Sequence, residues 1–199
     1  MSAIPLVEVL DEVRRCQLCA PELPHSPRPV VSASSTARLL IIGQAPGARV
    51  HASGIPWDDA SGDRLRDWLN LPRDTFYDVG RVAIVPMGFC YPGRGRSGDL
   101  PPRPECAPRW HRALLDGMPE VQLTLLIGRY AHGAYLPQAY SSLTAAVRDW
   151  RRHPPQYFAL PHPSPRNNIW LRRNPWFDTE VLPALRHRVG ECLQQSSER

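Results

Sequence analysis

The sequence predicts an α/β fold: a single domain over residues 1–199, in which helices cover both faces of a mostly parallel, four-stranded central sheet, giving three α/β/α layers. The chain has 199 residues, the size of one domain, and 42% of them are hydrophobic, enough to build a core. Four short apolar runs have the length of buried strands, and helical patterns lie between them. Strands that alternate with helices are typical of a parallel sheet covered on both faces.

The N-terminal segment Ile4–Arg15 is predicted to be a short helix because its apolar residues recur at helical spacing. These residues are Leu6, Val7, Leu10 and Val13. An irregular, proline-rich connector, Pro21–Pro29, follows. The next run, Arg38–Gly43 (RLLIIG), is apolar and ends in glycine, which favours a buried strand over a helix.

A second helix is predicted over Ser61–Leu69, with Ser61 as its N-cap and apolar side chains on one face. Those side chains are Leu65, Trp68 and Leu69. The other predicted strands are Arg81–Val85, Val121–Gly128 and Gln156–Leu160. The other predicted helices are Pro104–Leu115, Arg129–Leu136 and Asp178–Leu193.

The charge balance permits a nucleic-acid partner without requiring one. The 24 basic residues exceed the 19 acidic ones, leaving a net charge of +5, and all 24 are arginine. Genomic base composition is the simplest cause of the missing lysine, but arginine also pairs with phosphate through two parallel hydrogen bonds. No apolar run approaches the roughly 18–20 residues of a membrane span, and the N-terminus lacks a signal-peptide pattern.

Two loops directly after strands carry the candidate chemistry, because ligands in parallel α/β sheets bind beyond the carboxyl ends of the strands. The first is Gly43–Gly47 (GQAPG), and the second is His162–Asn167 (HPSPRN). Alone, each has a plain structural reading as a turn or a buried histidine. Together they occupy the two places where such a sheet builds a site.

These loops resemble motifs of the uracil-DNA glycosylase superfamily, most closely its iron–sulfur branch (families 4 and 5). The first loop resembles the Gly-Glu-Ala-Pro-Gly loop of family 4, and the second resembles the His-Pro-Ser loop of the superfamily. Gly54–Trp57 (GIPW), followed by Ser61-Gly62, is similar to the Gly-Arg-Pro-Phe…Gly segment of the family. The resemblance runs in order from about Cys16 to Arg166 and implies the same α/β/α fold.

The resemblance implies a monofunctional DNA glycosylase that flips out a deaminated base, uracil first, and hydrolyses its glycosidic bond in base excision repair. His162 would donate to the departing base, Trp57 would offer an aromatic face, and Gln44 would contact a base edge. The residues expected to bind substrate are Gly43, Ala45, Pro46, Gly47, Trp57, Ser164, Arg166 and Asn167. Without lysine, no side-chain Schiff base can form with the abasic sugar, which disfavours lyase chemistry.

The first loop departs from the family pattern at its carboxylate. Gln44 stands where family 4 has Glu, and Ala45 stands where family 1 has Asp; neither side chain can act as a base. The nearest carboxylates belong to Asp58 and Asp59, and similarity to family 5 favours Asp59. A cap for the following helix is the alternative role for this residue. His51, inside the same segment, is a second candidate for assisting the chemistry.

The substrate and even the activity have alternatives. Related enzymes carry an Asn after a strand that reads uracil, whereas Val85–Cys90 contains none. A glycosylase for hypoxanthine or xanthine is therefore one alternative. A catalytically weak or inactive lesion-binding module of the same fold is another, and a redox or iron–sulfur regulatory protein is the third.

Four cysteines form a possible metal site. Cys16 and Cys19 make a C-x-x-C pair, and Cys90 and Cys106 make a later pair, so four thiolates are available for zinc or an iron–sulfur cluster. The resemblance implies a [4Fe–4S] cluster with a structural role, with structural zinc as the alternative. Cys192 is expected to be a small hydrophobic residue of the last helix.

DNA, damaged and either double- or single-stranded, is the expected partner of a monomeric protein. Arginines gather in the inter-cysteine loop and after the second loop, where they would hold phosphates; a solvated basic face is the alternative. They are Arg94, Arg96, Arg103, Arg166, Arg172 and Arg173. The resemblance implies a bacterial-type cytoplasmic protein associated with the nucleoid.

Overall fold

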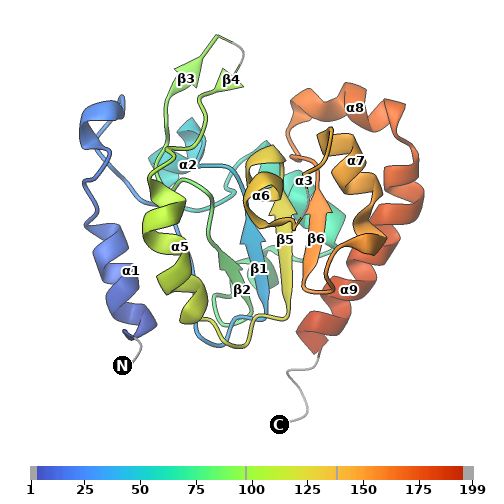
Figure 1. The fold of residues 1–199 in the computed structure, drawn as a ribbon, viewed down its shortest axis with the longest axis horizontal. Helices are drawn as coiled ribbons and strands as arrows, with labels where there is room; N and C mark the ends of the chain where they lie inside the picture. Colours follow the sequence, from blue (N-terminus) through green and yellow to red (C-terminus); the bar gives the residue numbers. More distant parts are fainter. Residues whose placement is uncertain (1–3, 97, 138, 195–199) are drawn as a thin grey trace.

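Four parallel strands form the centre of the computed structural model, which describes residues 4–96, 98–137 and 139–194 (Figure 1). The order across the sheet is β2-β1-β5-β6, and every neighbouring pair is parallel. The strands are β1 (Leu39–Ile42), β2 (Val82–Ile84), β5 (Leu123–Ile127) and β6 (Tyr157–Leu160). The four strands predicted from apolar runs are therefore confirmed.

The strands are apolar throughout because both faces of the sheet are covered. In β1, Leu39 and Ile41 join one hydrophobic cluster while Leu40 and Ile42 join the other, and all four are buried. The register continues this alternation across the sheet, with Ile41 opposite Leu125.

Helices form the two outer layers. On one face, α3 (Ala60–Leu69) and α9 (Leu182–Gln194) pack against the cluster that contains Leu125. On the other face, α1 (Leu6–Arg14), α5 (Cys106–Asp116) and α6 (Arg129–Tyr135) pack against the cluster that contains Leu40. The predicted three-layer α/β/α fold is confirmed.

Several short elements were not predicted, because helices of one or two turns show no clear periodicity. The additional α-helices are α2 (Ala48–Ser53), α4 (Arg73–Tyr77), α7 (Leu143–Arg148) and α8 (Asn168–Arg173). The 3₁₀ turns are η1 (Ala20–Glu22), η2 (Trp150–Arg152) and η3 (Pro165–Asn167). A two-stranded hairpin, β3 (Arg94–Gly95) and β4 (Gly98–Asp99), rises from the inter-cysteine segment beyond the carboxyl ends of the central strands (Figure 1).

Helix boundaries differ from the prediction where a cap or an irregular turn intervenes. The N-cap of α3 is Asp59 rather than Ser61, because the Asp59 carboxylate accepts the Gly62 backbone N–H at 2.9 Å. The last helix begins with a π-helical turn, η4 (Phe177–Val181), before α9. Pro5 is the N-cap of α1, so that helix is shorter than predicted at its start.

No helix in the described ranges is long and apolar enough to cross a membrane.

We expect Leu125→Ala to lower the free energy of unfolding by about 2–5 kcal/mol, because it empties space at the centre of the sheet. Leu125 is fully buried between Ile41 and Phe158 on the neighbouring strands. Urea unfolding followed by circular dichroism measures the change. Val7→Ala is the control, since Val7 is 62% exposed, and a loss below about 1 kcal/mol for Leu125→Ala would contradict this packing.

Candidate active site

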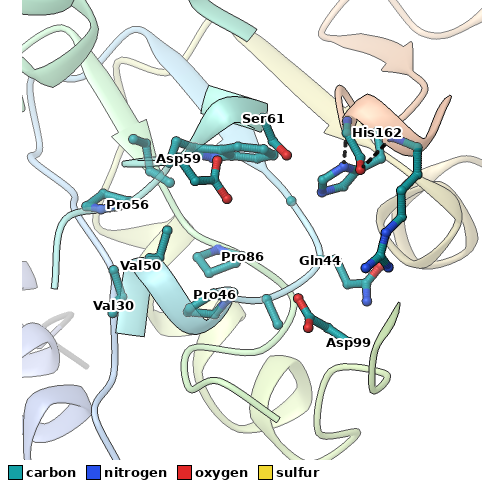
Figure 2. A pocket seen from close by; sticks show the side chains of 17 residues that line it. Val30, Gln44, Pro46, Val50, Pro56, Asp59, Ser61, Pro86, Asp99 and His162 are labelled. Carbon is teal, nitrogen blue, oxygen red and sulfur yellow. Dashed lines mark hydrogen bonds between the residues drawn. The ribbon is translucent and has the colours of Figure 1, made fainter. Parts of the chain in front are cut away.

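A cavity of about 240 Å³ lies where the carboxyl ends of β1 and β6 meet the β3–β4 hairpin (Figure 2). Its volume is that of several water molecules at roughly 30 Å³ each. Seventeen residues line it, most of them from the first loop, the segment before α3, and the second loop. They are Val30, Gly43, Gln44, Ala45, Pro46, Gly47, Val50, Pro56, Trp57, Asp59, Ser61, Ile84, Pro86, Asp99, His162, Ser164 and Arg166.

All the predicted catalytic and substrate-binding residues line this cavity except His51 and Asn167. β1 and β6 are separated in the sheet by β5, so the two loops reach the cavity from strands that are not neighbours. This arrangement follows the general placement of ligand sites in open α/β sheets.

The aromatic wall of the cavity is Trp57, whose backbone has a left-handed φ of 57°. This conformation is uncommon for a bulky residue and needs support from its surroundings. Support comes from Arg66, which donates to the Trp57 carbonyl at 3.4 Å. Two glycines make room: a Cβ on Gly43 would lie 2.8 Å from the indole ring, and a Cβ on Gly62 would overlap the Trp57 carbonyl oxygen.

One oxygen of the Asp59 carboxylate is hydrogen-bonded to the protein, and the other faces the cavity. Oδ1 accepts the Gly62 N–H, which caps α3 and fixes the side chain. Oδ2 lies 3.9 Å from the place where a Cβ on Gly47 would be, at the cavity wall. The capping and chemical readings of this residue are therefore compatible, because they use different oxygens.

His162 presents one defined ring nitrogen to the cavity. Its Nδ1 accepts the Ser164 backbone N–H at 3.2 Å, so a neutral ring carries its proton on Nε2. Burial lowers the pKa of His162 below its ordinary value, while the nearby charge of Asp59 acts in the opposite direction. The ring also lies 5.5 Å from the Trp57 ring, measured between centroids.

Two side chains hold the second loop in place from outside the cavity. Asn167 donates to the His162 carbonyl at 2.7 Å, and Arg64 donates to the Ser164 carbonyl at 3.1 Å. The Asn167 amide, which was predicted to contact substrate, is therefore already hydrogen-bonded within the protein. This role of Arg64 could not be predicted from the sequence, because nothing distinguishes Arg64 from other polar residues on the face of a helix.

His51 and Asp58 point elsewhere. The ring of His51 lies 5.3 Å from the ring of His25 and 6.0 Å from that of Tyr91, outside the cavity. Asp58 pairs with Arg73 at 3.1 Å, and this hydrogen bond lowers the pKa of Asp58. Of the two adjacent aspartates, only Asp59 lines the cavity.

The most important cavity residue that was not predicted from the sequence is Asp99. It lies in β4 of the hairpin and lines the same cavity as Asp59 and His162. Its surroundings, a glycine-rich stretch between two cysteines, match no motif. Ser61, predicted only as a cap, and Pro86 also line the cavity.

The predicted basic residues fall into three groups. Arg94, Arg96, Arg172 and Arg173 are exposed. Arg103 instead pairs with Glu105 at 2.6 Å, so its charge is largely balanced within the protein. Arg166 lines the cavity, and its guanidinium lies against Gly98 of the hairpin.

The four predicted ligand cysteines border one smaller cavity beside the hairpin. Cys16, Cys19, Cys90 and Cys106 line it together with Arg103 and Trp110, and all four are free thiols. The Phe89 backbone N–H points at Cys106 Sγ at 3.4 Å, and burial raises the pKa of the Cys106 thiol to about 12. Cys192 lies apart, buried in the core.

Across the described part of the chain, no three His, Cys, Asp or Glu side chains form a group that could hold a metal ion. A single zinc ion requires thiolates that converge at about 2.3 Å from one point. A four-iron cluster spreads its four thiolate ligands over a larger body. Cys16, Cys19, Cys90 and Cys106 border one cavity but, as placed in the described residues, do not form such a group.

A comparison with protein families supplies an independent finding. The family model described as the uracil DNA glycosylase superfamily matches residues 30–186. The matched range contains both loops, Trp57, Asp59 and the hairpin.

We expect the His162 ring to stay neutral, with its proton on Nε2, down to a lower pH than an ordinary histidine, whose pKa is about 6.5. The unfolded chain has the ordinary pKa, so this group lowers stability as the pH falls below that value. Long-range ¹H–¹⁵N NMR correlations distinguish the two tautomers and the cation. A proton on Nδ1 of the neutral ring, or a ring that becomes cationic at the pH of an ordinary histidine or above it, would contradict the geometry.

Proposed function

The chain belongs to the uracil DNA glycosylase superfamily, and we propose that it is a monofunctional DNA glycosylase that excises a deaminated base, uracil first, from DNA. The observation that carries the proposal is one cavity bordered by a fixed N–H donor, His162, a half-anchored carboxylate, Asp59, and an aromatic wall, Trp57. Hydrolysis of an N-glycosidic bond requires these three functions.

His162 stabilises the departing base. As the bond between C1′ and the base nitrogen breaks, its electron pair leaves with the base, and negative charge develops on the base oxygens. The Nε2–H of a neutral ring donates a hydrogen bond to such an oxygen without transferring its proton. Because Ser164 fixes the tautomer, the donor needs no rearrangement during the reaction.

Asp59 positions the attacking water. Its Oδ1 is anchored by the cap of α3, so Oδ2 is held at the cavity wall and accepts a proton of the water that adds to C1′. Gln44 can contribute an N–H to the base, although its amide also approaches the Leu100 carbonyl at 3.4 Å. Trp57 stacks on the flipped base.

DNA reaches this cavity beside exposed arginines. Arg172 and Arg173 lie at the end of α8, which follows the second loop, and Arg94 and Arg96 lie on the hairpin at the other side. Guanidinium groups in these positions bind phosphates on either side of the flipped nucleotide.

The four cysteines hold a [4Fe–4S] cluster in this proposal. Cys16, Cys19, Cys90 and Cys106 are its ligands, and the cluster ties the N-terminal segment to both ends of the segment that carries the hairpin. Bound there, the cluster supplies structural support and no step of the hydrolysis.

We expect the purified protein to convert a duplex containing one uracil into an abasic product that breaks only after alkali, because the chain has no lysine for a Schiff base. Asp59→Asn should slow single-turnover excision by about 100-fold or more, since asparagine still caps α3 but is a far weaker base. His162→Ala should cost about 100-fold to 1,000-fold. Gel analysis of a labelled strand measures all three rates.

Asp58→Asn is the matched control, because its carboxylate pairs with Arg73 outside the cavity. Parallel duplexes with hypoxanthine and xanthine decide the substrate. Tight binding without excision of any of the three bases would reject the glycosylase and favour a lesion-binding module, a reading motivated by Gln44 in place of the family glutamate.

We expect anaerobically purified protein to contain iron and to show an absorption shoulder at roughly 400 nm, typical of thiolate-ligated iron. Cys106→Ser should lose both signals, whereas Cys192→Ala should keep them because Cys192 lies in the core. Stoichiometric zinc without iron in the wild-type protein would reject the cluster.

A further inference from the structure

A second carboxylate enters the cavity from the hairpin. Asp99 Oδ2 lies 3.5 Å from the place where a Cβ on Gly47 would be, and Asp59 Oδ2 lies 3.9 Å from the same place. The two oxygens are therefore separated by at most the sum of these distances. Figure 2 shows the two carboxylates pointing toward each other from opposite sides of the cavity.

The position of Asp99 is electrostatically unfavourable for simple DNA binding. Its side chain is exposed at the mouth of the cavity, and within the described residues it has no hydrogen-bond or ion-pair partner. A phosphate backbone that approaches this mouth meets a negative charge, which weakens binding unless the carboxylate contacts something positive. One positive group at this mouth is the Arg166 guanidinium, which lies against the neighbouring Gly98. The sugar becomes a second positive group during a glycosylase reaction.

The hairpin that carries Asp99 is held over the cavity by contacts on both sides of that residue. Gln44 donates to the carbonyl of the next residue, Leu100, at 3.4 Å. The guanidinium of Arg166 lies against the preceding residue, Gly98. Leu100 also donates its backbone N–H to the Gly93 carbonyl at 2.8 Å, which closes the base of the hairpin.

We propose that Asp99 is a catalytic carboxylate that faces the deoxyribose from the side opposite Asp59 and stabilises the positive charge developing on it. The proposal rests on the glycosylase function and adds to it a residue with a distinct task. Asp59 holds the water; Asp99 takes no proton and acts through its charge.

In the step itself, a water oxygen bonds to C1′ as the bond between C1′ and the base nitrogen breaks. The electron pair of that bond leaves with the base, and one water proton passes to Asp59 and then to solvent. The sugar carries its largest positive charge between these events, when neither the water nor the base is fully bonded. A carboxylate that faces the sugar from the side opposite Asp59 stabilises this charged state more than it stabilises the neutral substrate.

The space beside Gly47 can accept a small side chain. The backbone of Gly47, with φ −84° and ψ 176°, is allowed for alanine, and a Cβ there would make only ordinary contacts. Gly47→Ala should therefore fold normally while placing a methyl group near both carboxylates, where the sugar would lie.

The decisive experiment compares wild type, Asp99→Asn and Asp58→Asn on the same uracil duplex. We expect Asp99→Asn to lower the single-turnover rate on the order of 10-fold to 100-fold, while its binding to the undamaged duplex stays equal or becomes tighter. Asp58→Asn should change neither quantity. An Asp99→Asn rate equal to wild type, or a loss that appears only in binding, would overturn the proposal.

A binding measurement tests the same charge without any turnover. Duplexes with a cationic pyrrolidine or a neutral tetrahydrofuran in place of the target sugar differ by one positive charge. Wild type should prefer the pyrrolidine, and Asp99→Asn should lose that preference at least severalfold, whereas Asp58→Asn should keep it. If wild type excises the base and Asp99→Asn still prefers the pyrrolidine duplex, only the role of Asp99 is rejected. No excision of uracil, hypoxanthine or xanthine by wild type rejects the glycosylase, and the preference then decides about Asp99 alone.

Discussion

The left-handed backbone of Trp57 is the constraint on which the site depends. Gly43 accommodates its ring, Gly62 accommodates its carbonyl, and Arg66 binds that carbonyl. The first residue of the first loop is thereby joined to the first turn of α3. Since Asp59 follows two residues after Trp57, the same turn sets the direction of the carboxylate. The Trp57 ring also contacts the His162 ring and so connects the two loops. The unfavourable backbone conformation of Trp57 thus fixes the arrangement of the cavity walls.

Asp59 and His162 each divide their side-chain atoms between the fold and the cavity. Asp59 gives one oxygen to a helix cap, and His162 gives one nitrogen to a backbone N–H of its own loop. The atoms left over therefore need little reorganisation to meet a substrate, which is the general condition for electrostatic catalysis. Asp99 differs, because only its backbone neighbours are held and its carboxylate is exposed.

The strands could be predicted because a doubly covered sheet demands continuous apolar runs such as Leu39–Ile42, and the two loops could be found because they follow such runs. The sequence offered both Ser61 and Asp59 as caps of α3, since both residue types cap well, and only the three-dimensional turn at Trp57 selects Asp59. Asp99 could not be predicted. It reaches the cavity through a hairpin of four paired residues, and neither its neighbours nor its spacing distinguish it from a surface aspartate.

The order of the strands has a kinetic consequence. His162 follows β6, an edge strand that pairs only with β5, whereas the first loop follows β1 in the interior of the sheet. Edge elements open more readily than interior ones, so transient release of β6 would remove the N–H donor while the first loop stayed in place. A newly made chain likewise lacks a complete cavity until its last strand has docked. Partly folded molecules would then carry the exposed arginines proposed to bind DNA but would lack the complete cavity proposed to excise a base.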